Sequence, residues 1–249
     1  MNIVLFPEVD ATSSIDLDDP RAIHLIDVLR LKVGDTFDAG IVDGDIGKGH
    51  IDSIETDRIV ISLDLDSTPP PLYPLTLIVG FPRPQSARDV LRDATTLGVS
   101  RIVFSGTEKG EKSYRSSSLW KRREYRRFLI QGACQAFSTR LPEVVLGDSI
   151  IESIGLCQDT SVRIALDNYE ATRELGYFTE SSNGAMSTTV AIGAERGWSA
   201  RERSHFRENG FLIAHLGRRV LRVETACVAA LSIVLSRFRR FPEDLEDRS

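Results

Sequence analysis

The sequence predicts an α/β protein of two domains: a small, mostly β domain, then a larger one whose parallel sheet is covered by helices on both faces. Its 249 residues are 41% hydrophobic and 27% charged, which is typical of globular proteins with a buried core. A proline-rich segment at residues 67–74 coincides with a change in net charge. Beyond this segment, short apolar runs alternate with helical patterns, the order that produces parallel sheets.

The domain boundary is expected at residue 70. Residues 1–70 carry fifteen Asp and Glu against five Lys and Arg, whereas residues 71–249 carry twenty-one against twenty-six. The prolines of the intervening segment cannot donate to a β-ladder, and they stiffen the chain. We therefore expect residues 1–70 and residues 71–249 to fold as separate domains.

Four short apolar runs in the first domain are separated by Gly and Asp turn clusters, which indicates a small β-barrel or sandwich. The expected strands are residues 2–6, 36–41, 49–54 and 58–65. Residues 19–30 form a helical pattern that begins with Pro20, a residue suited to the first turn of a helix. The glycine-rich segment 44–49 is interpreted as a hairpin turn rather than a phosphate-binding loop.

Strand and helix patterns alternate along the second domain. The expected strands are residues 75–79, 101–105, 162–166, 188–192 and 211–215. The expected helices are residues 86–97, residues 117–137, a helix after residue 192, and residues 224–238. Ser86 is the expected N-cap of the first helix and Gly98 its stop. Ser199 and Glu202 have the spacing of a capping box at the start of the third.

The last expected helix, residues 224–238, is apolar on nearly all sides and therefore must be enclosed on most of them. A homodimer would supply that cover. Cys227 lies within this helix, and apolar surroundings raise the pKa of a thiol, so we do not expect Cys227 to act as a nucleophile.

The sequence argues against a membrane protein and against an exported one. The longest stretch without a charged side chain, residues 67–82, contains five prolines, so it is not the apolar run of about 18 residues that a membrane helix requires. The first residues lack the basic start and long apolar core of an export signal. A cytoplasmic protein is expected.

Common motifs of metal and nucleotide sites do not occur in the sequence. Three cysteines without CxxC spacing and four histidines without an HExxH pattern argue against a bound metal. Neither GxGxxG nor GxxxxGK[ST] is available to hold phosphates, and no GxSxG marks a serine nucleophile.

Two glycine-marked strand ends are the remaining candidates for a site, at residues 192–198 and 216–226. Ligands of open parallel sheets bind beyond the carboxyl ends of the strands, where glycines let backbone amides approach a ligand closely. Taken as patterns alone, both segments are more typical of ordinary strand-to-helix turns than of a binding site.

The second of these segments, LGRRVLRVETA at residues 216–226, resembles the signature LGxRVLRxETA of the RsmE family. These are SPOUT-class enzymes that use S-adenosylmethionine to make N3-methyluridine in the 16S RNA of the small ribosomal subunit. Residues 24–35 resemble the family element HxxxVLRLKxGD, and residues 94–99 resemble ATELGV. Gln135 and residues 140–144 fit a third stretch, EQ followed by RxLPEI. The resemblance covers nearly the whole chain in order.

This resemblance implies a PUA-like β-barrel in residues 1–70 that helps to hold RNA. It also implies a SPOUT domain with a deep trefoil knot in residues 71–249, and a homodimer. The cofactor S-adenosylmethionine is expected between the loops of the knot. The residues expected to bind it are Leu166, Ile192, Gly193, Glu195, Gly197, Leu216, Gly217, Val220, Leu221 and Thr225.

Two residues are expected to take part in the chemistry. Arg222 would stabilise the negative charge that grows on the pyrimidine carbonyls when N3 attacks a methyl group. Glu195 would accept the imide proton or orient Arg222. Other roles are open: Arg222 can pair with Glu224 or Glu195, and Glu195 can bind backbone amides. Thr225 can cap the last helix instead of binding the cofactor.

A dense run of Lys and Arg at residues 108–140 is expected to contact RNA phosphates, while the target base turns out of its stack into the pocket. The other interpretation of such a run is a solvated helix face. The residues expected to bind RNA are Arg30, Lys112, Arg122, Arg123, Arg126, Arg127 and Arg140.

The sequence departs from the family pattern at several positions. Residues 193–197 read GAERG where the family has GPEGG, so Ala194 replaces a proline and Arg196 a glycine. Cys134 replaces the glutamate of EQ, Ser138 an arginine that usually follows, and Asp93 a lysine. These changes leave two alternatives open. One is a knotted RNA-binding or ribosome-assembly protein with weak or lost methyl transfer, and the other is a knotted methyltransferase for a different RNA.

Overall fold

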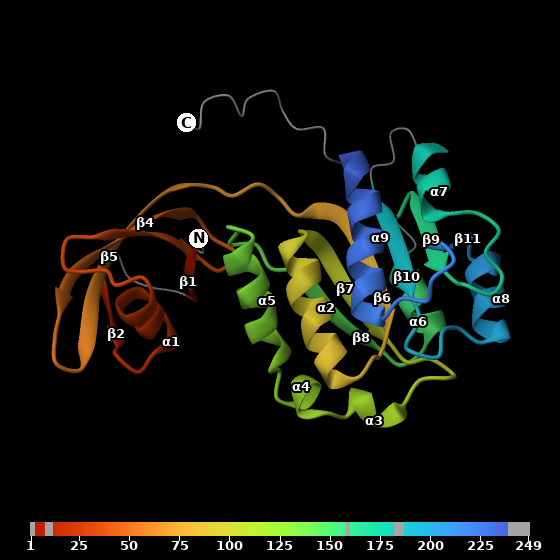
Figure 1. Cartoon of the computed structure of the whole chain (residues 1–249), viewed down its shortest axis with the longest axis horizontal. Coiled ribbons are helices and arrows are strands. Elements are labelled where there is room, and N and C mark those ends of the chain that lie inside the picture. Colours follow the sequence, from red (N-terminus) through yellow and green to blue (C-terminus); the bar gives the residue numbers. More distant parts are fainter. Residues whose placement is uncertain (1–2, 8–11, 158–159, 182–186, 239–249) are drawn as a thin grey trace. The chain divides into compact units, whose positions relative to one another are not determined.

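The structure is a computed structural model that describes residues 3–7, 12–157, 160–181 and 187–238. It divides into two compact units (Figure 1). The first comprises residues 1–71 together with residues 129–141, and the second comprises residues 72–128 and 142–249. Each unit has its own sheet and its own core.

The described part of the first unit contains a sheet in the order β1-β3-β4-β5-β2. Its strands are β1 (Val4–Phe6), β2 (Thr12–Asp16), β3 (Thr36–Ile41), β4 (Ile46–Ile54) and β5 (Arg58–Ser67). β1 and β3 run parallel, and the other pairs are antiparallel. Side chains alternate across the sheet, so Ile59 and Ile61 of β5 are buried against Phe6 and Leu25.

Several sequence predictions for this unit need correction. β2 was not predicted, and Asn2 of the first expected strand lies outside the described residues. β4 begins at Ile46, so most of the glycine-rich segment 44–49 is strand rather than turn, because Gly47 and Gly49 pair with Leu65 and Leu63 of β5.

The helical segment predicted at residues 19–30 begins at Pro20 as expected, but it changes from an α-helix to a π-helix after Ile23. α1 (Pro20–Ile23) begins with Pro20 in its first turn, and Asp19 caps it by accepting a 2.8 Å hydrogen bond from the Arg21 amide. The π-helical segment η1 (His24–Val28) follows. Leu25 is fully buried on this segment, whereas Val28 and Leu29 are exposed.

Residues 129–141 complete the first unit although they come from the second half of the chain. Ala133 packs with Ile3 and Leu5 in a small apolar cluster. Thr139 Oγ1 donates to the carbonyl of Gly44 at 2.6 Å, and the amide of Asp43 donates to the carbonyl of Thr139 at 2.8 Å. These bonds fix the turn between β3 and β4.

The second unit is built on a sheet in the order β11-β9-β10-β6-β7-β8, in which every described pair is parallel. Its strands are β6 (Tyr73–Gly80), β7 (Val99–Ser105), β8 (Glu143–Gly147), β9 (Val162–Leu166), β10 (Thr188–Ile192) and β11 (Leu212–Ala214). β9 and β10 have the predicted bounds, and β8 was not predicted. Because the strands are parallel, all their carboxyl ends lie at one edge.

Helices cover both faces of this sheet. α6 (Ile150–Gly155) and α8 (Ala200–Glu208) share a core with Ile78, Val103 and Ala191. The other face carries α2 (Pro84–Thr96) and α9 (Val223–Phe238), which pack against each other, while α7 (Leu175–Ser181) packs against α9 (Figure 1). α6 and α7 were not predicted. The capping box at Ser199 and Glu202 is confirmed.

Two predicted helices differ in the structure. α2 begins at Pro84 with Arg83 as its N-cap, because Pro84 occupies the first turn, so Ser86 is not the cap. The expected helix at residues 117–137 is interrupted.

Two helices replace it, α4 (Ser118–Lys121) and α5 (Tyr125–Gln135), and a further short helix, α3 (Lys112–Arg115), precedes them. Arg123 has a left-handed backbone with φ of 55°, which breaks the helical hydrogen-bond ladder between α4 and α5.

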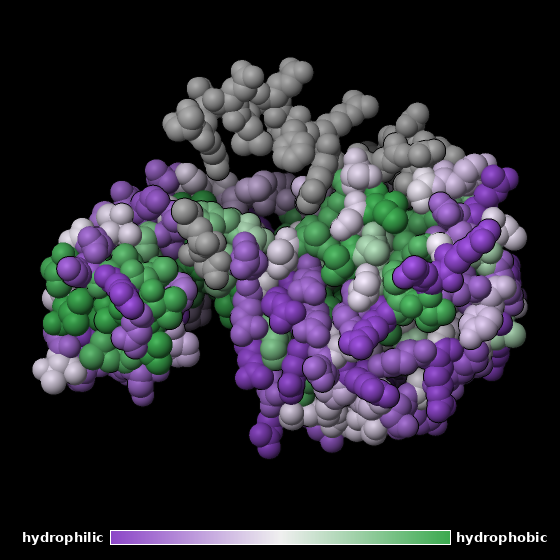
Figure 2. Space-filling view, in the orientation of Figure 1, coloured by the Kyte–Doolittle hydropathy of each residue, from purple (hydrophilic) through white to green (hydrophobic). Residues whose placement is uncertain are grey.

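α9 combines a buried face with a partly exposed apolar one. Cys227, Leu231 and Leu235 are buried, whereas Val228 and Ile233 are half-buried. Figure 2 shows hydrophobic residues at the surface over α9. The cover that a second copy would give this face stays a prediction. In the part of the chain that the structure describes, no helix has both the length and the hydropathy needed to cross a bilayer.

Gly80, at the carboxyl end of β6, is a position where a side chain would collide. A Cβ there would lie 2.6 Å from the Ala194 amide nitrogen and 2.8 Å from Thr107 Cγ2. We expect Gly80→Ala to lower the free energy of unfolding by about 1–3 kcal/mol, because the backbone at Ala194 must move. The control is Gly155→Ala, where an added Cβ meets no atom within 4 Å. Urea titration measures both, and equal midpoints for the two variants would contradict the prediction.

Candidate functional site

Three loops leave neighbouring strands at the carboxyl edge of the parallel sheet. β9 lies between β10 and β11, so the loops at residues 167–174, 193–199 and 215–222 start side by side. The topology thereby brings together the strand ends at Leu166 and Ile192 with the segment that starts at Leu216.

A buried tryptophan connects the first two loops. Trp198 is fully buried and packs edge-on against Phe206, with ring centroids 4.8 Å apart. Its Nε1 donates to the carbonyl of Leu166 at 2.9 Å. The Asp167 amide donates to the carbonyl of Ala214 at 2.9 Å, which ties the same loop to the end of β11.

Arg203, on α8, holds the first two loops together. Its Nη1 donates to Trp198 O at 2.9 Å and to Asp167 Oδ2 at 3.3 Å, and its Nε donates to Glu170 Oε1 at 2.7 Å. The side chains of Arg203 and Asp167 are only 11% and 1% exposed. Hydrogen bonds from Arg207 and Arg203 lower the pKa of Glu170. Asp167 and Arg203 were not predicted as site residues.

The second loop closes as a tight glycine turn. The Gly197 amide donates to the carbonyl of Ala194 at 2.8 Å, and Gly197 has a left-handed φ of 61°. A Cβ on Gly193 would lie 2.9 Å from the Gly197 Cα, so the turn requires glycine there. Ala194 is buried and the Arg196 side chain is exposed. The turn therefore closes without a proline, and Arg196 points to solvent instead of occupying the turn.

Glu195 lies beside the start of α2. Its Oε1 accepts a 2.9 Å hydrogen bond from the Arg83 amide, at the N-cap of that helix. A carboxylate is favoured near a helix N-terminus because of the exposed amides there. The structure thus gives Glu195 a backbone-amide partner, and its role in proton transfer stays a prediction.

The third loop carries the LGRRVLR segment. His215 Nδ1 accepts from the Gly217 amide at 3.0 Å, and the His215 backbone bonds to Arg173 and Leu175 at 3.0 and 2.9 Å. Gly217 has φ of 103°, a conformation that favours glycine. Leu216 and Leu221 are half-buried, and Val220 is 85% exposed.

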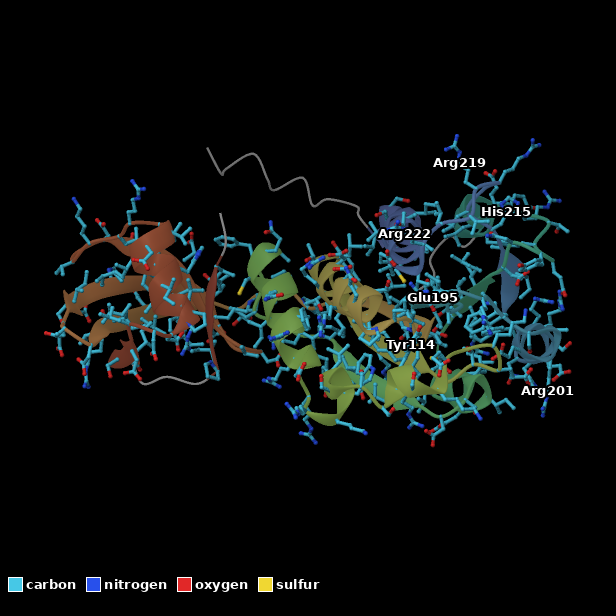
Figure 3. The ribbon with its side chains drawn as sticks, turned by 60° about the horizontal axis from the view of Figure 1, so that its bottom comes forward. Tyr114, Glu195, Arg201, His215, Arg219 and Arg222 are labelled. Carbon is cyan, nitrogen blue, oxygen red and sulfur yellow. The ribbon has the colours of Figure 1, made fainter. Side chains whose placement is uncertain are left out.

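Arg222 directly precedes α9 (Figure 3). Thr225 lies in the first turn of that helix. Among the described residues, the exposed Arg222 side chain makes no ion pair, so it pairs with neither Glu224 nor Glu195 here. The Arg222 carbonyl accepts the first helical bond, from the Ala226 amide at 2.8 Å. Thr225 is exposed inside the first turn and does not occupy the N-cap position.

Cys227 follows in the same helix turn and is buried. Burial raises the pKa of its thiol, and Glu224 raises it further. A nucleophilic role is therefore unfavourable. Within the described ranges, no cluster of His, Cys, Asp and Glu could hold a metal ion.

The cationic residues expected to contact RNA are largely free to do so. Six of the seven are exposed: Arg30, Lys112, Arg122, Arg123, Arg126 and Arg127. Arg140 is half-buried, and its Nη1 donates to the carbonyl of Asp43 at 2.8 Å. Four of the exposed residues surround the break between α4 and α5. Their role in binding RNA stays a prediction.

A further cavity, which the sequence did not predict, lies at the ends of β7 and β8. It has a volume of about 600 Å³ and is lined in part by Phe81, Thr107, Lys112, Arg115 and Arg201. Two of its three cations are already paired, Arg115 with Asp148 and Arg201 with Glu108 at 3.7 Å. The lining is therefore of mixed polarity and is not a concentrated anion site.

Comparisons with known proteins agree on one family. The model of the family described as RNA methyltransferase domain matches residues 68–235. Ribosomal RNA small subunit methyltransferase E of Treponema pallidum is 37% identical over 246 residues, which cover 95% of this chain and 91% of that protein.

Solved structures share the fold. Ribosomal RNA small subunit methyltransferase E of Neisseria gonorrhoeae, bound to S-adenosyl methionine, has a TM-score of 0.74 and 20% identity, with 95% of this chain and 97% of that chain covered. A Legionella pneumophila protein in complex with the cofactor SAM has a TM-score of 0.77 and 19% identity, with 94% and 96% covered.

The Arg203 bridge can be tested by removing its charge. We expect Arg203→Met to lower the free energy of unfolding by about 3–5 kcal/mol, because Asp167 is left buried without a cation. The matched control is Arg207→Met, one turn further along α8, whose exposed pair with Glu170 is worth no more than about 1 kcal/mol. Urea titration gives both values, and amide hydrogen exchange should accelerate in residues 167–170 only for Arg203→Met. Similar losses in the two variants would contradict the bridging role.

Proposed function

The chain belongs to the RNA methyltransferase family that includes ribosomal RNA small subunit methyltransferase E, and on this premise we propose that it methylates N3 of a uridine in 16S ribosomal RNA with S-adenosylmethionine. The observation that carries the proposal is the position of the LGRRVLRVETA segment. It leaves β11 at the same carboxyl edge as the glycine turn of β10, with β9 between the two strands, and this is the edge where parallel sheets bind ligands.

The loops fit an adenosine-containing cofactor. A Cβ at Gly217 would meet no atom within 4 Å, and a Cβ at Gly197 would meet only Tyr169 Cε2, at 4.0 Å, so open space lies against both glycines. Leu216 and Leu221 are half-buried apolar residues on the third loop. We assign the adenine to these leucines and to main-chain groups of the two glycine loops. When bound, the cofactor supplies an electrophilic methyl group on a sulfonium centre.

The chain's own residues would act on the uracil. Arg222 has no ion-pair partner among the described residues, so its guanidinium is available to stabilise charge on a uracil carbonyl as N3 loses its proton. Glu195 Oε1 is engaged by the Arg83 amide, which leaves Oε2 as the oxygen that would accept that proton. The loops would position the uracil against the methyl donor, and positioning of this kind contributes about 7 to 11 kcal/mol.

The same family membership carries proposals on architecture and location. We assign a PUA-like barrel to residues 1–70, which would help to hold RNA, and a SPOUT domain with a trefoil knot to residues 71–249. The half-buried apolar residues on α9, such as Val228 and Ile233, support a homodimer. The exposed cations of α3 to α5 support contacts with RNA phosphates, and a substrate within the ribosome would place the enzyme in the cytoplasm.

The alternative of a binding protein without methyl transfer rested on the departures at Ala194, Arg196, Cys134 and Ser138. The first two do not block the glycine turn, because Ala194 is accommodated in a buried position and Arg196 points to solvent. Ala194 and Arg196 therefore give no specific support to the alternative, and the part played by Cys134 and Ser138 stays a prediction.

Two measurements test the proposed function. Calorimetric titration with S-adenosylmethionine should show binding, and its absence would favour the binding-protein alternative. Mass spectrometry of 16S RNA nucleosides should show that N3-methyluridine disappears in a deletion strain and returns on complementation. If N3-methyluridine persists in the deletion strain, the uridine assignment is wrong.

Arg222 and Arg219 provide a matched pair of variants on one loop (Figure 3). We expect Arg222→Gln to lower kcat by about 10²- to 10³-fold, the usual loss when one charge-stabilising donor is removed, with little change in cofactor affinity. Arg219→Gln should leave both quantities unchanged. Steady-state methylation assays measure kcat, and calorimetry measures the cofactor affinity. An unaltered kcat in Arg222→Gln would exclude the charge-stabilising role.

A further inference from the structure

Tyr169 is an exposed aromatic residue on the first of the three loops of the candidate site. It follows β9 by three residues and is 77% exposed. A Cβ added to Gly197 would lie 4.0 Å from Tyr169 Cε2, so the ring borders the glycine turn of the second loop. The tyrosine therefore lies next to the turn assigned to the cofactor.

The backbone that carries this ring is held in place. Asp167 Oδ1 accepts hydrogen bonds from the amides of Tyr169 and Glu170, at 2.8 and 2.7 Å. Asp167 and Glu170 are both bonded to Arg203. The chain is thus fixed on either side of Tyr169, and a ligand that stacks on the ring would order little additional backbone.

Two cations flank the ring. Lys109 Nζ lies 5.9 Å and Arg203 Cζ lies 5.8 Å from its centroid. Lys109 is itself anchored, since Nζ donates to the carbonyl of Trp198 at 2.8 Å. The surroundings of the ring therefore combine an aromatic face with positive charge, the two features that proteins use to hold single-stranded nucleic acid.

The surroundings also argue against an apolar partner. The adjacent residues Asn168 and Glu170 are polar and exposed, as are Glu195 and Arg196 on the neighbouring turn. An apolar docking surface needs a contiguous patch, whereas Tyr169 is a single ring among polar groups. A planar ligand with polar edges matches this setting.

We propose that Tyr169 is a stacking platform for a base of single-stranded RNA next to the methylated nucleotide. The proposal rests on the proposed function, because that function places RNA at this edge. The ring borders the same turn as the cofactor, so the base it holds would be a direct neighbour of the target uridine. Stacking of this kind tolerates any base, so Tyr169 would contribute affinity and orientation rather than sequence choice.

The test measures RNA binding separately from catalysis. The probe is a short uridine-containing single-stranded RNA with 2-aminopurine beside the uridine, and fluorescence anisotropy of an end label gives its Kd. We expect Tyr169→Ala to weaken binding by about 5- to 150-fold, while Tyr169→Trp retains it. Stacking should quench 2-aminopurine fluorescence in the wild type and not in Tyr169→Ala. Calorimetry should give the same cofactor affinity for all variants.

Tyr177 provides the matched control. It is 47% exposed on α7, and its ring also lies near a cation, with Arg173 Cζ 4.3 Å from the centroid. Tyr177→Ala should leave RNA affinity unchanged. Wild-type RNA affinity in Tyr169→Ala, no rescue by Tyr169→Trp, or no measurable RNA binding by the wild type would overturn the platform.

Two further results distinguish the stacking platform from a contact between subunits and from the proposed function itself. If Tyr169→Ala changes the sedimentation of the protein from dimer to monomer, the ring belongs to an interface between copies and the proposal is wrong. If the wild type binds RNA through Tyr169 but methylates no uridine, the platform stands and the proposed function fails.

Discussion

The Arg203 guanidinium neutralises Asp167 inside the second unit and at the same time donates to the Trp198 carbonyl. Asp167 in turn orders the backbone after β9, and Trp198 anchors the end of the glycine turn after β10. A single charged side chain thus connects two of the three loops of the candidate site. Both partners are nearly excluded from water. Removing one of them would therefore lower the free energy of unfolding more than removing one partner of a surface pair, because the other charge would stay buried without a counter-charge.

The sequence was sufficient to find the strands and loops that border the site. The apolar runs of β9 and β10 have clear ends, and the glycines after β10 and β11 mark the two turns. The capping box identified the start of α8 because both of its residues are local in sequence. The pairing of Asp167 with Arg203 could not be found in this way, since it joins residues 36 positions apart on separate elements. Glu195 illustrates the same limit, because its partner is the amide of Arg83.

The predicted and the observed folds differ where local backbone features do not show in the pattern of apolar residues. A helical pattern of apolar residues continues through residues 117–137, but the left-handed backbone of Arg123 interrupts the hydrogen bonds without interrupting the pattern. The apolar run of β8 has only three residues, 144–146, between a glutamate and a glycine, so its pattern is too brief to mark a strand. α2 starts two residues early because Pro84 can enter the first turn, a choice that a prediction based on a serine cap does not anticipate.

The first unit includes residues 129–141, so the sequence that it needs is not continuous along the chain. Residues 1–70 do not hold everything that their own fold uses, because Ala133 covers Ile3 and Leu5, and Thr139 bonds the turn before β4. A gene fusion or recombination event that copied only residues 1–70 would leave that segment behind in the donor. The N-terminal unit is therefore not a transferable module, and evolution has to move or alter it together with a stretch encoded far downstream.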